Sequence, residues 1–242
     1  LYLRIPRRFI EGAQIPLRLH MVIIQEFDNI HRMKKGFYLV FEGIVGCGKT
    51  TQSTLLFEKL KKDFPKKEII WTKEPGGTEI ANTIRKVVQA TPFEEEMEPV
   101  CEQYLYAASR AQALRKVIAP ILKRGGIVIS DRSFFTSMAY QGFGRGLGLK
   151  KVLEINKEAV GDMWPDKVIF VDTKIDEALS RAKDQSGDKF ESFKKDFFIK
   201  VRNGYKIVAK EYPLLVTTVN GNGTIDDVQS KIYLLVKSWI KR

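Results

Sequence analysis

The sequence predicts an α/β fold in which a five-stranded parallel sheet is covered by helices on both faces. Short apolar runs bounded by turn residues recur between residues 37 and 219, and segments with helical periodicity separate them. A glycine-rich segment joins the first expected strand to the first expected helix. The chain has 242 residues and a hydrophobic share of 44%, which suits one such domain with a core of its own.

Each element follows from its local pattern. Apolar runs of strand length lie near residues 37–42, 68–72, 126–130, 167–171 and 214–219. Stretches with helical spacing lie near residues 49–63, 77–89, 98–124, 133–141, 147–160, 174–185, 189–211 and 224–240. Pro120 is expected to kink the end of the third helix, because proline has no N–H to donate. Since strands and helices alternate, the sheet should be parallel and buried on both faces.

The first 32 residues lack this alternation and show no sustained period. Met33 leads directly into the first expected strand, so we expect residues 1–32 to be an extension that the core domain, residues 33–242, does not need. The product of an upstream reading frame and a flexible tail are both consistent with this pattern. Acidic residues within the segment disfavour a transit peptide.

The formal net charge of +12 leaves three kinds of anionic partner to consider: nucleic acid, a membrane surface and a small anionic substrate. The basic residues are scattered in pairs such as Lys61-Lys62, Lys66-Lys67 and Lys150-Lys151, and they form no arginine-rich block. We therefore expect most of them to be solvated surface and part of the excess to serve a phosphate-rich ligand. A nucleic-acid partner is not expected, because the clustered basic and aromatic surface of such proteins is missing.

Cysteine usage and hydropathy bear on location. Cys47 and Cys101 lie far apart in the sequence and lack the spacing of metal ligands, which is typical of a reducing cytoplasm. No apolar run approaches the roughly 20 residues that span a bilayer. A secretory signal is not evident either. We therefore expect a cytoplasmic protein with no membrane partner.

Residues 43–50 carry a complete G-x-x-x-x-G-K-[ST] phosphate-binding loop between a strand and a helix. The glycines let several N–H groups point at one anion, and the helix N-terminus adds partial positive charge. Lys49 can reach the β- and γ-phosphates of ATP, and the Thr50 hydroxyl can ligate Mg²⁺. The pattern predicts the three-layer fold of P-loop NTPases. The expected ATP-binding residues are Gly43, Ile44, Val45, Gly46, Cys47, Gly48, Lys49, Thr50 and Thr51.

Three further clusters can carry chemistry. Asp131 and Arg132 follow the third expected strand, at the edge where open α/β sheets bind ligands. A carboxylate there can hold Mg²⁺, and the guanidinium can clamp a phosphate. Glu74 opens a Glu-Pro-Gly-Gly-Thr turn after the second strand, where two glycines allow close approach of a ligand. Tyr106 and Arg110 share one helix face, which either binds a nucleobase or combines a core tyrosine with a surface arginine.

These motifs in this order resemble the thymidylate kinase family, P-loop enzymes that phosphorylate dTMP. The resemblance spans about residues 34–240. Beyond the loop and the clusters above, it rests on matching runs at residues 131–133, 139–146, 164–166, 188–191 and 201–205. The phosphate loop contains no arginine, so the resemblance is to the bacterial-type members, which supply transition-state charge from a lid. It implies ATP as phosphoryl donor, Mg²⁺, a helical lid at about residues 181–191, and a homodimer.

The resemblance also implies catalytic and metal-binding roles. Lys49 and Thr50 are expected to hold ATP and Mg²⁺, and Asp131 to support the metal. Arg132 is expected to grip the acceptor phosphate. Arg181 is the first candidate for the lid cation, with Lys183 or Lys189 next.

The expected substrate-binding residues are Glu74, Tyr106, Arg110, Arg132, Ser137, Tyr140 and Gln141. Tyr106 resembles the aromatic residue that stacks on thymine, and Arg110 the residue that bonds its edge. Ser137 matches a small polar contact to the base. Tyr140 matches the tyrosine that packs under the deoxyribose and disfavours a 2′-hydroxyl.

The chain departs from the family pattern at three positions. Val45 stands where the family usually has an acidic residue that helps to bind the 3′-hydroxyl of the acceptor. Ser109 replaces a frequent aspartate before the base-contacting arginine, and Lys189 replaces an arginine in the lid. Lysine lacks the bidentate fork of arginine. The loss of the acidic residue bears on acceptor affinity and on sugar selectivity.

The expected reaction is transfer of the γ-phosphoryl group of ATP to dTMP, giving dTDP for dTTP synthesis. The nearest alternative is a kinase for another deoxynucleoside monophosphate such as dUMP, because one methyl group gives only about 1–3 kcal/mol of discrimination. A non-catalytic nucleotide-binding paralogue is the alternative of another class, and Val45 would then mark decay. Intact Lys49, Thr50, Asp131 and Arg132 argue against it.

Overall fold

A single parallel sheet organises the computed structural model, which describes residues 36–89, 93–183 and 194–240. The strand order is β2-β3-β1-β4-β5. The strands are β1 (Phe37–Glu42), β2 (Ile69–Lys73), β3 (Ile127–Asp131), β4 (Lys167–Asp172) and β5 (Val216–Asn220). The strands expected from the sequence are confirmed, with ends that shift by no more than 2 residues.

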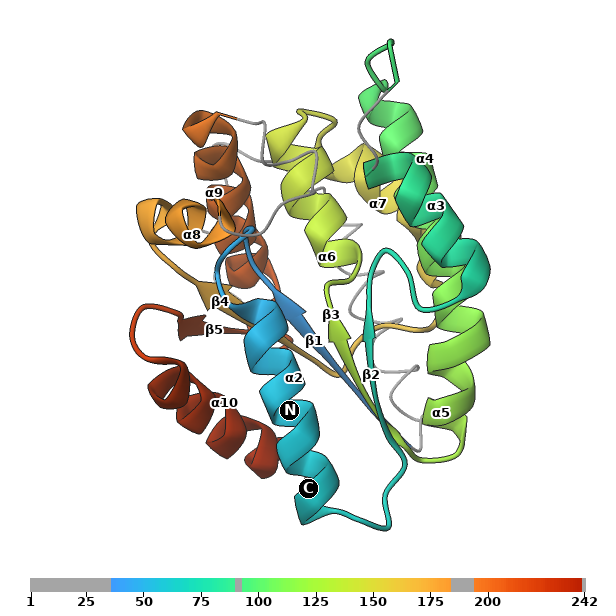
Figure 1. The fold of residues 1–242 in the computed structure, drawn as a ribbon. Coiled ribbons are helices and arrows are strands. Elements are labelled where there is room, and N and C mark those ends of the chain that lie inside the picture. The colour runs from blue at the N-terminus through green and yellow to red at the C-terminus, as the bar shows by residue number, and fades with distance from the viewer. Residues whose placement is uncertain (1–35, 90–92, 184–193, 241–242) are drawn as a thin grey trace, which may run out of the picture.

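Helices cover both faces of the sheet, which gives the three layers (Figure 1). The helices are α2 (Lys49–Asp63), α3 (Glu79–Gln89), α4 (Pro99–Ala113), α5 (Ala119–Lys123), α6 (Phe134–Ser137), α7 (Leu149–Val160), α8 (Ile175–Lys183), α9 (Lys195–Glu211) and α10 (Ile225–Ile240). Helices α2 and α10 pack together on one face, in front of the sheet in Figure 1, and α4, α7 and α9 belong to the other. Right-handed crossovers between parallel strands place α2 on the face opposite to α4, α7 and α9, because the chain reverses its direction across the sheet after β2. Helix α10 follows the last strand and packs on α2.

Two expected helices are interrupted by π-helical turns. The expected helix 98–124 contains a π-helical turn at Leu114–Ile118, and the expected helix 133–141 passes into a second one at Met138–Gly144. Pro120 was expected to kink the end of the first, and the irregular turn lies directly before it. Because Pro120 has no N–H for the carbonyl four residues earlier, the turn before it can widen into a π-helical one, and the expected kink itself stays a prediction.

Glycines in left-handed conformations shift two helix starts. The helix expected from residue 77 begins at Glu79, since Gly77 has φ 91°, and the one expected from residue 147 begins after Gly148, with φ 78°. The expected extension, residues 1–32, lies outside the described residues. So does most of the expected lid, of which the structure describes only residues 181–183 at the end of α8.

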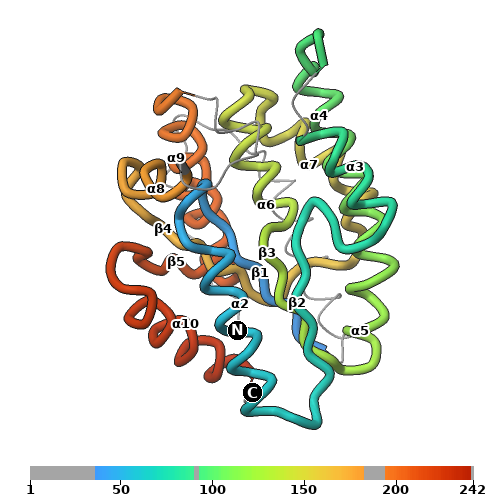
Figure 2. Tube along the Cα trace, in the orientation of Figure 1, coloured from blue at the N-terminus to red at the C-terminus, as the bar shows by residue number. Residues whose placement is uncertain are grey.

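The carboxyl ends of β1, β2 and β3 meet at one edge of the sheet (Figure 2). Asp131 is in register with Phe41 of β1 and with Lys73 of β2. The pairing continues past the strands, since the Arg132 N–H donates to the Phe41 carbonyl at 2.9 Å and the Glu74 N–H to the Asp131 carbonyl at 2.9 Å. The segments that follow the three strands therefore begin side by side, and they carry the residues with expected chemistry.

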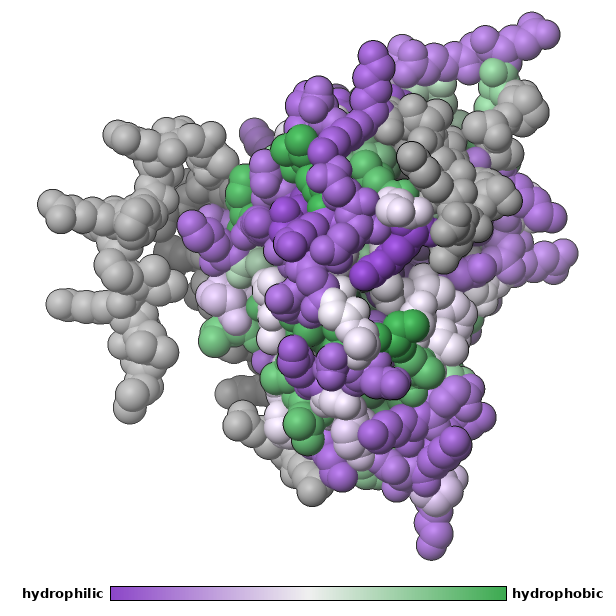
Figure 3. Space-filling view, turned by 60° about the vertical axis from the view of Figure 1, so that its left-hand side comes forward, coloured by the Kyte–Doolittle hydropathy of each residue, from purple (hydrophilic) through white to green (hydrophobic). Residues whose placement is uncertain are grey.

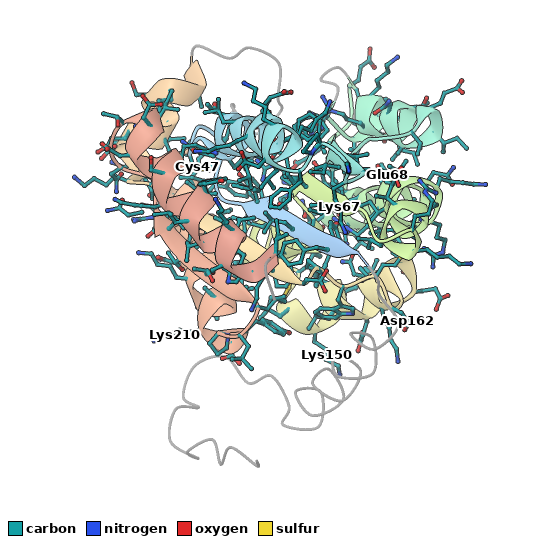
Figure 4. All side chains as sticks on the ribbon, turned by 90° about the horizontal axis from the view of Figure 1, so that it is seen from below. Cys47, Lys67, Glu68, Lys150, Asp162 and Lys210 are labelled. Carbon is teal, nitrogen blue, oxygen red and sulfur yellow. The ribbon has the colours of Figure 1, made fainter. Side chains whose placement is uncertain are left out.

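Three lysines of the described residues illustrate how the basic side chains are distributed. Lys67, Lys150 and Lys210 lie at separate places around the molecule (Figure 4). Hydrophilic residues cover most of the face seen in Figure 3, and hydrophobic residues appear between them in small groups. Across the described part of the chain, no helix is both long and apolar enough to cross a membrane.

Candidate active site

The loop between β1 and α2 has a backbone suited to binding an anion. Gly46 and Gly48 have φ values of 71° and 94°, and a Cβ at Gly46 would lie 1.8 Å from the carbonyl oxygen of Ala178. Only glycine fits both demands at Gly46. Helix α2 starts at Lys49 and runs for 15 residues, so its free N–H groups and the positive end of its dipole face the loop.

Lys49 lies across this loop. Its Nζ donates a 3.3 Å hydrogen bond to the Ile44 carbonyl, and its side chain is buried. Burial, followed by the neighbouring charge of Arg132, lowers the pKa of Lys49. A phosphate in the loop opposes both effects by favouring the charged ammonium. The residue is therefore placed to neutralise a bound polyphosphate.

Thr50 and Asp131 form a pair that fits a divalent cation. The Thr50 hydroxyl donates to Oδ2 of Asp131 at 2.5 Å. The other oxygen, Oδ1, is buried and accepts no hydrogen bond within the described structure. A carboxylate oxygen buried without a donor and set beside a hydroxyl is a suitable donor set for Mg²⁺, which prefers oxygen ligands and keeps several of its waters. The two residues expected to hold the metal are thus adjacent.

Arg132 lies between the phosphate loop and a neighbouring pocket. Its Nη1 donates to the Gly43 carbonyl at 3.2 Å and to Oγ1 of Thr136 at 3.3 Å. The guanidinium carbon is 5.2 Å from the centre of the Tyr140 ring. These contacts fix a delocalised cation where it can reach anions on both sides.

The pocket beside Arg132 has a volume of about 360 Å³, part of which is open to solvent. Every residue expected to bind the acceptor lines it: Glu74, Tyr106, Arg110, Arg132, Ser137, Tyr140 and Gln141. These residues come from the turn after β2, from α4, from the segment directly after β3, and from α6 with the π-helical turn after it. The structure therefore gathers into one cavity residues that lie up to 67 positions apart, from Glu74 to Gln141.

Arg110 is buried, so the alternative of a surface arginine is excluded. Its Nε donates to Oε2 of Glu74 at 2.7 Å, and the side chains of both residues are 3% exposed. Nη1 donates to Oδ1 of Asn156, and Nη2 donates to Ser137 Oγ at 3.3 Å. Three acceptors from three different segments thus hold the guanidinium rigid against the pocket.

Tyr140 connects the pocket to the phosphate loop. Its hydroxyl accepts the Val45 N–H at 3.1 Å, and its ring makes edge contacts with Phe197 and Tyr205 of α9. The tyrosine is 2% exposed, so these neighbours fix its position. The side chain of Val45 is partly buried against the hydrophobic core. Val45 therefore packs its side chain on the core and donates its N–H to Tyr140.

Arg181, the first candidate for the lid cation, lies on α8 beside the phosphate loop. The backbone of Ala178 and Ala182 would contact a Cβ placed on Gly46. The Arg181 side chain is 44% exposed and forms an ion pair with Glu177 at 3.6 Å. Lys183 ends the helix, and Lys189 lies outside the described residues.

The sequence analysis assigned no role to four residues of this region. Glu42, Thr136, Asn156 and Tyr205 form buried hydrogen bonds to the site or to its supports. Glu42 had a signal, because it is the one carboxylic acid in an apolar strand expected to be buried on both faces. Asn156 had none, since one polar residue on an amphipathic helix is ordinary.

A phosphate loop beside a second polar pocket, with Arg132 between them, is suited to hold two phosphate-bearing ligands side by side. This arrangement, on this sheet order, defines a P-loop NTPase fold adapted to phosphoryl transfer between small molecules. The sequence matches the family model of thymidylate kinase over residues 41–232. The chain therefore belongs to the thymidylate kinase family.

Individual relatives agree with this assignment. The chain is 37% identical over 207 residues to the thymidylate kinase of Caldanaerobacter subterraneus subsp. tengcongensis, covering 86% of this chain and 98% of the relative. It is 41% identical over 207 residues to that of Lactobacillus delbrueckii subsp. bulgaricus, covering 84% and 97%. The crystal structure of thymidylate kinase from Ehrlichia chaffeensis is similar at a TM-score of 0.68, with 27% identity, covering 84% of this chain and 98% of that one.

Proposed function

We propose that the protein transfers the γ-phosphoryl group of ATP to the phosphate of dTMP, giving dTDP. The observation that carries the proposal is the position of Arg132, whose guanidinium bonds the phosphate loop at Gly43 and lines the adjoining pocket. Membership of the thymidylate kinase family supports dTMP as the occupant of that pocket. The intact Lys49 and Asp131 argue for a catalytic protein rather than a binding paralogue.

The chemistry needs charge neutralisation more than a base. The attacking group is an oxygen of the acceptor phosphate, which is already anionic, so no proton has to be removed from it. Positioning and electrostatic stabilisation then dominate the rate. Lys49 neutralises the donor phosphates, and Arg132 holds the acceptor phosphate in line with them. Arg181 is the described candidate for the further cation, because its helix packs against the loop.

Thr50 and Asp131 would hold Mg²⁺, through the hydroxyl and the buried Oδ1 oxygen. When bound, the metal would supply charge neutralisation at the donor phosphates. The threonine hydroxyl now donates to Oδ2 of Asp131 and can turn its lone pairs outward. Asp131 is buried at the end of β3, where its backbone pairs with Phe41 of β1 shortly before the phosphate loop.

The pocket supplies contacts that suit a pyrimidine deoxynucleotide. Tyr106 presents an aromatic face for stacking, and Arg110 presents donors fixed by Glu74. Gln141 donates its amide N–H to Oε1 of Glu102 at 2.7 Å, and its own oxygen is buried without a donor. That oxygen can accept a base N–H. The Tyr140 ring, held by its neighbours, forms the floor expected under the sugar.

A coupled ADP-release assay on the full chain tests the proposal. Purified enzyme with ATP and Mg²⁺ should release ADP at a rate that depends on added dTMP, and EDTA should abolish that rate. A similar rate without dTMP would indicate an ATPase instead, and no ADP with any nucleoside monophosphate would support the non-catalytic alternative. A faster rate with dUMP would favour the other deoxynucleotide kinase.

Three further expectations remain predictions: a homodimer, a cytoplasmic location, and an extension that the core does not need. Light scattering on purified protein measures the first. Comparison of the full chain with a chain that starts at Met33 measures the third, through activity and melting temperature. A lower activity or a lower melting temperature of the shortened chain would show that residues 1–32 contribute to the domain.

A further inference from the structure

Glu42 is a buried carboxylate that none of the roles above uses. It ends β1 directly before the phosphate loop, it is fully buried, and the strand residues before it are Phe-Tyr-Leu-Val-Phe. Burying an ionised carboxylate is costly unless hydrogen bonds and nearby charge compensate it. Its retention in a strand that an apolar residue would suit better therefore calls for a physical reason.

Five donors surround this carboxylate. Oε1 accepts the Ser133 N–H at 2.8 Å, the Ser133 hydroxyl at 2.8 Å and the Thr136 N–H at 3.2 Å. Oε2 accepts the Thr136 hydroxyl at 2.5 Å and the Tyr205 hydroxyl at 2.8 Å. Burial raises the pKa of the Glu42 carboxyl, while the bond from Thr136 and the charge of Arg132 oppose that shift. The carboxylate thus ties the start of the phosphate loop to the segment after β3 and to α9.

These bonds bracket Arg132. Among the described residues, Arg132 is the non-glycine residue with positive φ, at 79°. A residue with a Cβ adopts this conformation only where its surroundings hold it. Its own N–H is fixed by the Phe41 carbonyl at 2.9 Å, and the next N–H, that of Ser133, is fixed by Glu42. Residues at the end of β1 thus hold the peptide groups on both sides of Arg132.

Glu42 also acts on the guanidinium through one hydroxyl. Because Thr136 donates its proton to Glu42, the lone pairs of the same oxygen are free to accept from Nη1 of Arg132 at 3.3 Å. Charge-assisted hydrogen bonds of this kind polarise one another in a buried site. The second acceptor of that Nη1, the Gly43 carbonyl, belongs to the residue after Glu42.

We propose that Glu42 is a positioning residue that sets the backbone and the guanidinium of Arg132 for the acceptor phosphate. The inference rests on the proposed function. It makes a selective claim: Glu42 holds Arg132 at the phosphate end of the acceptor, whereas Arg110 at the base end is held by other side chains. A purely structural carboxylate would support all parts of the pocket alike, and it would support ATP binding as well.

The test is Glu42→Gln, which keeps the shape and removes the charge. The affinity for dTMP should fall by about 10- to 100-fold, the range expected for loss of a charge-assisted contact. The affinity for thymidine, which lacks the phosphate, should stay within about twofold, and KM for ATP within about threefold. Glu68→Gln is the matched control, because Glu68 pairs with Arg124 at the surface, before β2. Calorimetric titration with dTMP and with thymidine gives both affinities.

A double-mutant cycle provides the second readout. If Glu42 acts through Arg132, Glu42→Gln should change dTMP affinity by less than about twofold in an Arg132→Ala background. Equal losses for thymidine and dTMP, or additive losses in the cycle, would overturn the proposal. If Glu42→Gln does not fold, Tyr205→Phe removes one donor from Oε2 with little change of shape. It should give a smaller loss with the same selectivity for the phosphate.

The two proposals fail in different ways. An unmodified enzyme that binds no dTMP and releases no ADP with it would refute the proposed function. An active enzyme in which Glu42→Gln weakens thymidine as much as dTMP would refute the role of Glu42 and leave the function standing.

Discussion

Removal of the Glu74 carboxylate should destabilise the protein strongly. Glu74→Ala leaves the Arg110 guanidinium buried without its carboxylate, from which its Nε is now 2.7 Å away. Breaking a buried ion pair from one side costs about 3–5 kcal/mol. Burial raises the pKa of the Glu74 carboxyl, and the charge of Arg110 opposes that shift, so burial offsets part of the attraction in the pair. In the variant, Arg110 would still donate to Asn156 and Ser137. Both facts favour the lower end of that range.

A matched control isolates the effect of burial. Glu68 pairs with Arg124 at 2.8 Å, nearly the same distance, but their side chains are 43% and 56% exposed. Solvent screens an exposed pair, so such a pair contributes little to stability. Glu68→Ala should therefore leave the stability almost unchanged.

Thermal denaturation followed by circular dichroism compares the two variants. For a chain of this size about 3–5 kcal/mol corresponds to a decrease in melting temperature of about 6–20 °C, whereas the Glu68→Ala variant should melt close to the wild-type temperature. Equal decreases for Glu74→Ala and Glu68→Ala would refute the view that burial makes the Arg110 pair indispensable. A larger decrease for Glu68→Ala would refute it as well.

Three further variants test the site. Lys49→Ala should lower kcat by about 10³-fold, by analogy with other phosphate-binding cations, while the melting temperature stays near that of the wild type. Steady-state rates within about tenfold of the wild-type rate would argue against a catalytic loop. Tyr140→Ala should raise the ratio of kcat/KM for the ribose analogue to that for dTMP, since the ring no longer crowds a 2′-hydroxyl, and an unchanged ratio would remove Tyr140 from that role. Val45→Asp should lower KM for dTMP by about 10- to 100-fold through a new charge-assisted hydrogen bond and leave KM for ATP nearly unchanged. Weaker dTMP binding would instead show that the site is built around an apolar group.

The sequence was sufficient for the parts of the fold that local patterns encode. The five strands and the phosphate loop follow from short apolar runs, from glycine positions and from the turn between strand and helix. The parallel sheet then follows from alternation, and its edge brings Asp131 next to the loop that carries Thr50. These inferences need only neighbouring residues and the rule that parallel strands end at one edge.

The sequence could not predict which side chains from distant segments contact one another. Whether Arg110 is buried or exposed depends on Glu74, 36 positions earlier, and on Asn156, 46 positions later. The donors to Glu42 come from residues 91 to 163 positions away. No local period encodes such contacts. The π-helical turn before Pro120 was not predicted for another reason. The N–H that proline lacks can be accommodated by a kink or by a widened turn, and the sequence does not distinguish the two.

One competition measurement tests the central claim most directly. The enzyme is given Mg²⁺, a limiting amount of ATP labelled in its γ-phosphate, and equal concentrations of dTMP, dUMP, dCMP and the ribose analogue of dTMP. Chromatography of the products then shows which diphosphate carries the label. The account predicts that dTDP carries most of the label. The diphosphate formed from the ribose analogue should carry much less label than dTDP. Label found mainly in another diphosphate, or only in inorganic phosphate, would contradict the assignment of this pocket to dTMP.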